Sequence, residues 1–121
     1  MSGKYQLRRS SNDQFYFNLK AGNGEIILTS ETYTTKSSAE KGIEAVRKNA
    51  PMDDSYDRRA ALNGYPYFIL KAANGEVIGR SETYSSEAAM ERGIEAVKKN
   101  ATSARINDLT NSLQIESSQV T

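Results

Sequence analysis

Residues 15–20 alternate hydrophobic and polar side chains with the period of two that is typical of a β-strand with one buried face. Phenylalanine and leucine occupy the hydrophobic positions, whereas Tyr16 and Lys20 occupy polar ones. An Asn-Gly dipeptide follows, and the apolar residues 26–28 come shortly after it. Because Asn-Gly is the strongest short signal for a hairpin turn, this stretch predicts two antiparallel strands.

A helical pattern follows the predicted hairpin. Ala39, Ile43, Val46 and Ala50 are spaced by four, three and four residues. This spacing places them in one apolar stripe along a helix. It predicts an amphipathic helix that packs its apolar side on the sheet.

The whole pattern occurs twice in the chain. Residues 16–50 align without a gap with residues 67–101, and 22 of the 35 aligned positions are identical. Such agreement indicates a tandem duplication. Opening strands are predicted at residues 5–9 and 56–60, and a final strand at residues 104–109. Each copy is therefore expected to form three strands and a helix.

Both predicted helices carry a start signal and an internal glycine. Ser37 with Glu40 matches a capping box, and Ser86 is the expected N-cap of the second helix. Gly42 and Gly93 fall inside the helices, although each costs about 1 kcal/mol of helix stability relative to alanine. We expect these glycines where the helix backbone comes close to the sheet.

These elements predict an α+β fold. A copy of about 50 residues buries too little surface to be comfortably stable alone, so we expect one domain at residues 1–110. Repeat one takes residues 4–53 and repeat two residues 55–109, forming a mainly antiparallel sheet with two packed helices. The two sheets join either edge to edge or face to face. Polar residues dominate residues 111–121, where we predict a disordered tail.

The composition excludes several kinds of functional site. The 121 residues include no His and no Cys. The chain therefore lacks the commonest general base near neutral pH, any disulfide and any thiolate nucleophile or zinc ligand. We predict no catalytic residue, no metal site and no cofactor. The sequence shows neither a signal peptide nor an apolar run of ~20 residues, which predicts a cytoplasmic protein that does not bind membranes.

Three motifs recur in both copies: Phe-x-Leu-Lys-Ala-x-Asn-Gly-Glu, Ser-Glu-Thr-Tyr and Gly-Ile-x-Ala-Val-x-x-Asn. With these motifs the chain resembles the YegP-like family of small bacterial proteins of unknown function, over roughly residues 4–109. The resemblance implies β-β-β-α units that join into one sheet and exchange their closing strands. It also implies that residues 55–59 both close copy one and open copy two. The resemblance implies no activity or catalytic residue, and we expect a monomer that is an internal pseudo-dimer.

The polar face of the predicted strands carries a duplicated pair of side chains, Tyr16 with Lys20 and Tyr67 with Lys71. An exposed sheet with aromatic and basic residues can stack single-stranded bases. Tyrosine and lysine also often just cover the solvated side of a sheet. The formal net charge of only +1 argues against a nucleic-acid partner. The leading hypothesis is a non-enzymatic interaction protein that binds a protein partner here, with single-stranded nucleic acid as the alternative.

Four further tyrosines are candidates for a binding site. Tyr5 and Tyr56 are candidates to join the same polar face. Tyr33 and Tyr84 occupy identical settings between the last strand and the helix of each copy, where a hydroxyl can contact a ligand. The competing interpretation is that their rings close the end of the core.

Paired carboxylates suggest a remote enzymatic alternative. Glu40 and Glu44 in copy one, and Glu91 and Glu95 in copy two, lie four residues apart on a helix. Such pairs can share acid–base chemistry with tyrosines or bind a hard cation. The simpler interpretation, which we favour, is that Glu44 and Glu95 form surface ion pairs with the lysines four residues later.

Overall fold

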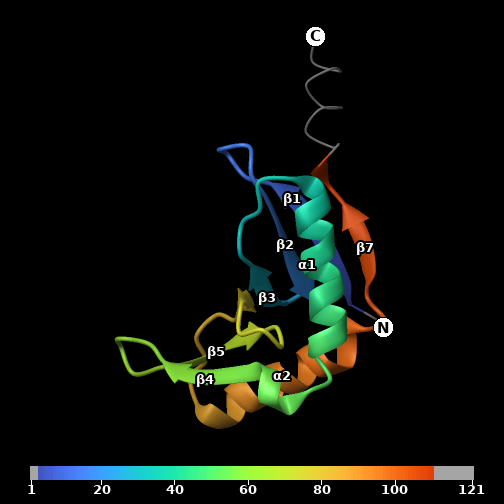
Figure 1. Ribbon diagram of the computed structural model, residues 1–121. Helices are drawn as coiled ribbons and strands as arrows, with labels where there is room; N and C mark the ends of the chain where they lie inside the picture. Colours follow the sequence, from blue (N-terminus) through green and yellow to red (C-terminus); the bar gives the residue numbers. More distant parts are fainter. Residues whose placement is uncertain (1–2, 111–121) are drawn as a thin grey trace.

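The computed structural model describes residues 3–110. The tail predicted at residues 111–121 lies outside the described residues. In chain order, the elements are β1 (Lys4–Arg9), β2 (Phe15–Lys20), β3 (Ile26–Ser30), α1 (Lys36–Asn49), a short 3-10 helix (Asp53–Ser55), β4 (Tyr56–Ala60), β5 (Pro66–Lys71), β6 (Val77–Arg80), α2 (Glu87–Ala101) and β7 (Arg105–Asp108). The predicted α+β fold with three strands and a helix in each copy is confirmed (Figure 1).

All seven strands form one sheet in the order β4-β5-β6-β3-β2-β1-β7. The two copies meet where β3 pairs antiparallel with β6, through Thr29 opposite Arg80 and Ser30 opposite Gly79. Of the two alternatives left open by the sequence, edge-to-edge joining is therefore the one that occurs. Beyond these two pairs, the Glu31 amide donates to the Ile78 carbonyl at 3.1 Å, so the ladder between the half-sheets is short.

The junction breaks the symmetry of the repeat at one position. Gly79 aligns with Leu28 of the first copy, and a Cβ atom on Gly79 would lie 2.7 Å from the Thr29 carbonyl oxygen and 3.2 Å from a side-chain carbon of Leu28. Two leucines would therefore collide here. Glycine in one copy lets β3 and β6 come close enough to pair.

The last strand crosses from the second copy to the first. β7 follows α2 but pairs parallel with β1, with Tyr5 opposite Ile106. The Leu109 amide continues this pairing by donating to the Leu7 carbonyl at 2.8 Å. The Lys36 ammonium of α1 also forms an ion pair with Asp108. In the described residues, β4 has no corresponding strand along its outer edge.

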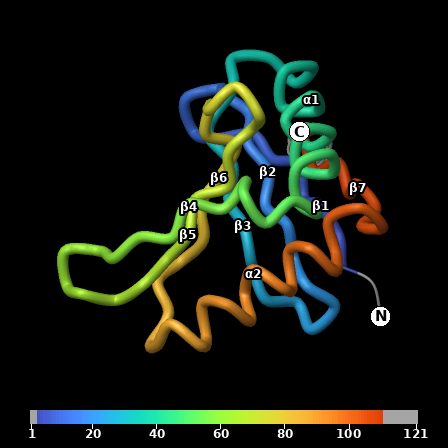
Figure 2. The backbone as a smooth tube through the Cα atoms, turned by 60° about the horizontal axis from the view of Figure 1, so that its bottom comes forward, coloured from blue at the N-terminus to red at the C-terminus, as the bar shows by residue number. Residues whose placement is uncertain are grey.

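One hydrophobic core lies between the inner face of the sheet and both helices. The largest side chains of this core are fully buried; they are Tyr5, Leu7, Phe17, Leu19, Leu28, Ile43, Val46, Phe68, Leu70, Ile94 and Val97. Because strand residues alternate between faces, the even-numbered residues of β2 lie on the opposite, outer face. In Figure 1, α1 runs alongside β1 and β2, and α2 lies below the β4–β5 hairpin. Figure 2 shows the same hairpin projecting from the rest of the molecule.

The N-cap residue of the helix is the predicted one in the second copy but not in the first. The Ser86 hydroxyl accepts a hydrogen bond from the Ala89 amide at 3.1 Å, as expected of an N-cap. In the first copy the N-cap is Thr35, which accepts from the Ser38 amide at 3.0 Å, so the capping box predicted at Ser37 is wrong. Thr35 provides the same hydroxyl acceptor two residues earlier.

Tyr5 and Tyr56 lie in the core, so the expectation that they join the outer face is wrong. The Tyr5 hydroxyl donates to the Ala101 carbonyl at the end of α2, at 2.7 Å. The Tyr56 hydroxyl donates to the Ala50 carbonyl at the end of α1, also at 2.7 Å. Each opening strand therefore satisfies a carbonyl group at a helix C-terminus, where such groups lack partners within the helix.

Candidate functional site

The outer face of the sheet carries the residue pairs predicted from the repeat. Tyr16 and Lys20 project from β2, and Tyr67 and Lys71 from β5, all partly exposed. In residues 3–110, the buried sides of both helices join the core on the inner face, and the outer face has no helix over it. The predicted face therefore exists as a solvent-facing surface.

This face is much more basic than the whole chain. Its strand positions follow from alternation and from the register of the ladders. The basic residues at these positions are Lys4, Arg8, Lys20, Arg59, Lys71, Arg80 and Arg105, and the acidic one is Asp57. The chain as a whole has a formal charge of +1, so opposite charges are segregated onto other surfaces. Net charge was therefore a poor guide to the potential of this surface.

The two halves of the outer face differ in charge, because the acidic residue Asp57 of the second copy has no acidic counterpart in the first. Its carboxylate lies 2.8 Å from the Arg59 guanidinium and 3.3 Å from the Lys71 ammonium. Hydrogen bonds from these two cations lower the pKa of Asp57. In the first copy Gln6 takes the place of Asp57 and accepts a hydrogen bond from Arg8 at 2.7 Å. Within residues 3–110, the half formed by β2, β1 and β7 thus carries cations without a carboxylate among its outward strand positions.

The tyrosines of this face stand beside arginines. Arg8 is the cross-strand neighbour of Tyr16, and Arg59 is the neighbour of Tyr67. The Arg80 guanidinium lies 5.3 Å from the centre of the Tyr67 ring, which is the geometry of a cation–π contact. Tyr67 is therefore partly engaged within the protein, whereas the Tyr16 ring has no such contact among the described residues.

Tyr33 and Tyr84 lie elsewhere, at the two ends of the β3–β6 junction. Each packs against the core and lines a surface pocket. Burial, aided by two nearby glutamates in each case, raises the pKa of both phenols; the glutamates are Glu31 and Glu76 for Tyr33, and Glu82 and Glu25 for Tyr84. The interpretation that these rings close the end of the core therefore agrees with the structure, and contact with a ligand stays a prediction.

The glycines inside the helices are explained by these two tyrosines. A Cβ atom on Gly42 would lie 2.5 Å from the Tyr33 hydroxyl oxygen and 3.0 Å from a ring carbon of Phe17. A Cβ atom on Gly93 would come closer still to the Tyr84 hydroxyl. The close approach expected from the sequence is therefore real, with the tyrosine ring as its main partner.

Three of the four helix glutamates have cations as partners. Glu44 lies 2.6 Å from Arg47, and Glu95 lies 3.5 Å from Lys98, so their ion-pair partners are three residues away rather than the predicted four. Glu91 accepts hydrogen bonds from Arg58 of β4, at 2.6 Å for the shorter one. In the part of the chain that the structure describes, no group of three acidic side chains could hold a metal ion. None of the helices in residues 3–110 is long and apolar enough to cross a membrane.

Sequence reasoning missed five cations of the outer face: Lys4, Arg8, Arg59, Arg80 and Arg105. Arg8 and Arg59 could have been predicted, because each lies an even number of residues from other outward-facing residues of its strand. Arg105 was not, because its side of the sheet depends on the long-range pairing of β7 with β1.

The fold and these surfaces define a class of small tandem-repeat α+β protein with an open, basic sheet face. The chain belongs to a family described as a domain of unknown function (DUF1508), whose model matches it twice, at residues 10–57 and 61–108. A UPF0339 protein from Shewanella oneidensis is 56% identical over 110 residues, which cover 91% of this chain and 100% of that protein. The UPF0339 protein YegP of Escherichia coli K12 is 53% identical with the same coverage.

Two solved structures of relatives have the same fold. The solution NMR structure of UPF0339 protein SO3888 from Shewanella oneidensis superimposes with a TM-score of 0.86 at 56% identity, covering 91% of this chain and 93% of that one. The NMR structure of YegP from Escherichia coli, described as a protein of unknown function, also gives 0.86, at 53% identity, covering 91% and 95%. The resemblance stated from the sequence motifs is confirmed.

Proposed function

We propose that this protein is a non-enzymatic binding protein that holds single-stranded nucleic acid on the outer face of its sheet. The observation that carries the proposal is the charge of that face, where seven cations accompany one carboxylate. Phosphate groups are the natural partners of such a surface. The low net charge, which counted against nucleic acid at first, no longer does so because the cations are concentrated.

The tyrosines supply the second requirement of this kind of binding. Single-stranded bases stack on aromatic side chains of an open sheet, and flanking Lys and Arg contact the backbone phosphates. Tyr16 stands between Arg8 across the ladder and Lys20 four residues along its own strand. We place the main contact in the half of the face that lacks a carboxylate, around Tyr16, Lys20, Lys4 and Arg105. A cytoplasmic location, which stays a prediction, is consistent with such a partner.

The test compares equivalent residues of the two copies. Binding of a fluorescently labelled oligonucleotide, a single-stranded mixed sequence, is measured by anisotropy from low to moderate salt. We expect affinity to fall as salt rises, and Lys20→Ala to weaken binding more than Lys71→Ala, because Lys71 is paired with Asp57. Tyr16→Ala is expected to reduce affinity by about 1–3 kcal/mol, the usual contribution of one stacked base.

Two outcomes would contradict the proposal. Absence of binding at low salt would reject nucleic acid as the partner. Equal, salt-dependent binding of the oligonucleotide and of a poly-glutamate peptide, unaffected by Tyr16→Ala, would indicate an acidic protein segment as the partner instead. The leading hypothesis from the sequence would then be the better one.

A further inference from the structure

Two surface pockets flank the junction between the half-sheets. The first has a volume of about 680 Å³ and the second about 510 Å³, within the range of small-molecule sites. They lie on either side of the short β3–β6 ladder, which consists of two residue pairs and the hydrogen bond from the Glu31 amide to the Ile78 carbonyl. The first pocket lies between the start of β3 and the segment after β6, and the second between the start of β6 and the segment after β3.

The two pockets are built from equivalent residues. In the first, the β2–β3 hairpin contributes Glu25, and the second copy contributes Glu82, Tyr84 and Arg92. The second pocket has, at the aligned positions, Glu76 from the β5–β6 hairpin and Glu31, Tyr33 and Lys41 from the first copy. Each pocket therefore needs both copies, and neither copy could form one alone.

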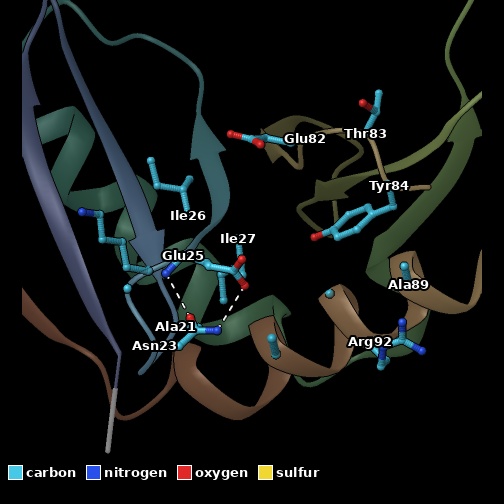
Figure 3. A pocket seen from close by; sticks show the side chains of 14 residues that line it. Ala21, Asn23, Glu25, Ile26, Ile27, Glu82, Thr83, Tyr84, Ala89 and Arg92 are labelled. Carbon is cyan, nitrogen blue, oxygen red and sulfur yellow. Dashed lines mark hydrogen bonds between the residues drawn. The ribbon is translucent and has the colours of Figure 1, made fainter. Parts of the chain in front are cut away.

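Hydrogen bonds with a neighbouring asparagine orient the hairpin glutamate of each pocket. The Asn23 amide group donates to the Glu25 carboxylate at 3.1 Å and accepts from the Glu25 backbone amide at 3.0 Å. Asn74 and Glu76 repeat this arrangement at 3.2 and 3.0 Å. Figure 3 shows the Tyr84 hydroxyl directed across the first pocket toward the β2–β3 hairpin. The Asn-Gly-Glu motif thus positions a pocket carboxylate in addition to making the turn.

The charges in each pocket are of both signs and come from different elements. Two carboxylates approach from the hairpin and from the segment after the partner strand, and a cation stands on the helix. In the first pocket, Lys20 of β2 is a second cation. The Tyr33 and Tyr84 phenols are protonated at neutral pH, because their ordinary pKa of about 10 is already well above it and burial raises it further, so each hydroxyl can donate or accept a hydrogen bond. Alanine and isoleucine side chains, Ala21, Ile27 and Ala96 in the first pocket, provide an apolar wall.

From this arrangement we propose that each pocket binds a free α-amino acid with an apolar side chain, two molecules per chain. The ammonium group lies between the two glutamates and the tyrosine hydroxyl, and the carboxylate group faces Arg92 or Lys41. The apolar side chain packs against the alanine and isoleucine wall. A simple cation would leave the helix cation without a partner, and a simple anion would leave the two glutamates without one, whereas a zwitterion can pair with both.

The proposal is independent of nucleic-acid binding on the outer face, although Lys20 lines the first pocket as well as that face. Lys20 is therefore left unchanged in all the variants used to test the pockets. Amide chemical shifts of the full chain are followed by NMR during titration with L-alanine, L-valine, L-leucine, L-isoleucine and L-methionine at millimolar concentration. N-acetyl-L-leucine, which lacks the ammonium group, and isopentylamine, which lacks the carboxylate, are the control probes.

We expect at least one of the amino acids to shift the signals of residues 21–27 and 82–96, and also those of residues 31–45 and 72–78, with both control probes much weaker. Glu82→Gln should weaken binding in the first pocket about tenfold or more and leave the second unchanged, because a hydrogen bond to a charged group is lost. Glu31→Gln should do the reverse. Glu87→Gln, an exposed glutamate of α2 outside both pockets, is the matched control.

In each variant the unchanged pocket is a control for folding, because binding there requires a correctly folded chain. No shift with any of the five amino acids would overturn the proposal. It would also be overturned if Glu82→Gln and Glu87→Gln affected the first pocket equally, or if N-acetyl-L-leucine bound as well as L-leucine.

Discussion

The Tyr84 ring lies directly on the backbone of α2 at Gly93, where its hydroxyl occupies the space that any Cβ atom would need. The same relationship joins Tyr33 to Gly42 in α1. The Ser-Glu-Thr-Tyr segment and the helix glycine are therefore one structural unit, although about ten residues separate them in the sequence. The glycine lowers helix propensity, and the contact with the tyrosine compensates for it.

This contact predicts that Gly93→Ala destabilises the protein, although alanine is the better helix former. We expect the free energy of unfolding to fall by about 1–3 kcal/mol, the usual cost of overpacking. In a Tyr84→Ala background, the same substitution should instead stabilise the protein by up to about 1 kcal/mol, because only the helix propensity remains. Urea unfolding of the four proteins in this cycle measures both effects. If Gly93→Ala were stabilising in both backgrounds, the tyrosine would not be what requires the glycine.

The serines of the Ser-Glu-Thr-Tyr segments predict a second pair of stability losses. The buried Ser30 hydroxyl accepts from the Phe17 amide at 2.9 Å and donates to the Glu31 carbonyl at 2.7 Å. Ser81 makes the same two bonds, at 3.0 and 2.8 Å, in the second copy. Ser30→Ala and Ser81→Ala should each lower the free energy of unfolding by about 1–3 kcal/mol, because a buried amide loses its acceptor.

Ser37→Ala is the matched control for these serines, since Ser37 is exposed and within α1. Its effect should stay within about 0.5 kcal/mol. Chemical denaturation followed by circular dichroism distinguishes the three variants. Equal effects at Ser30 and Ser37 would show that the buried hydrogen bonds contribute little.

The buried tyrosines predict a loss of stability in alkaline solution. Burial raises the pKa of Tyr5 and of Tyr56 well above the value of about 10 expected in the unfolded chain. The folded state therefore binds these protons more tightly. Their contribution is fully present below about pH 10 and is lost as the pH rises above it, by up to about 1.4 kcal/mol per pH unit for each group.

Unfolding free energies measured between pH 8 and about pH 11 test this dependence. The double variant Tyr5→Phe/Tyr56→Phe should be less stable at neutral pH, because two hydrogen bonds to helix carbonyls are lost, and should show a shallower alkaline decline. Tyr65→Phe, at an exposed position, should decline like the parent protein. A decline of equal slope in all three would assign it to other groups.

The outer edge of β4, which has no pairing strand among residues 3–110, predicts a variant that self-associates. Arg58 aligns with Leu7 of the first copy and points to the helix side, where its guanidinium lies 2.6 Å from Glu91 and 3.1 Å from Asp53. An inward-pointing charge of this kind discourages another strand from pairing with an exposed edge. Arg58→Leu should therefore form dimers or larger species as concentration rises.

Light scattering after size-exclusion chromatography over a range of concentrations detects this association. Lys99→Leu, which makes the same change of charge on an exposed part of α2, should keep the size of the parent protein. If both variants behaved alike, general hydrophobicity rather than the β4 edge would be the cause.

The sequence alone determined the elements and their number. The identical copies, the Asn-Gly turns and the apolar stripe through Ile43 and Val46 are local signals, and each predicted a strand, turn or helix that the structure contains. The alternation of faces along a strand could also have placed Tyr5 in the core, because it lies two residues from the hydrophobic Leu7. For Tyr56 the same rule is misleading, because the residue two positions later, which aligns with Leu7, is the charged Arg58.

Only the tertiary structure decided how the two copies meet and what this creates. The pairing of Thr29 with Arg80 joins residues far apart in the sequence, and no local period encodes such a contact. That pairing gathers cations from both copies on one face, although the whole chain is nearly neutral. It also brings residues of both copies together in the two pockets that flank this short strand junction.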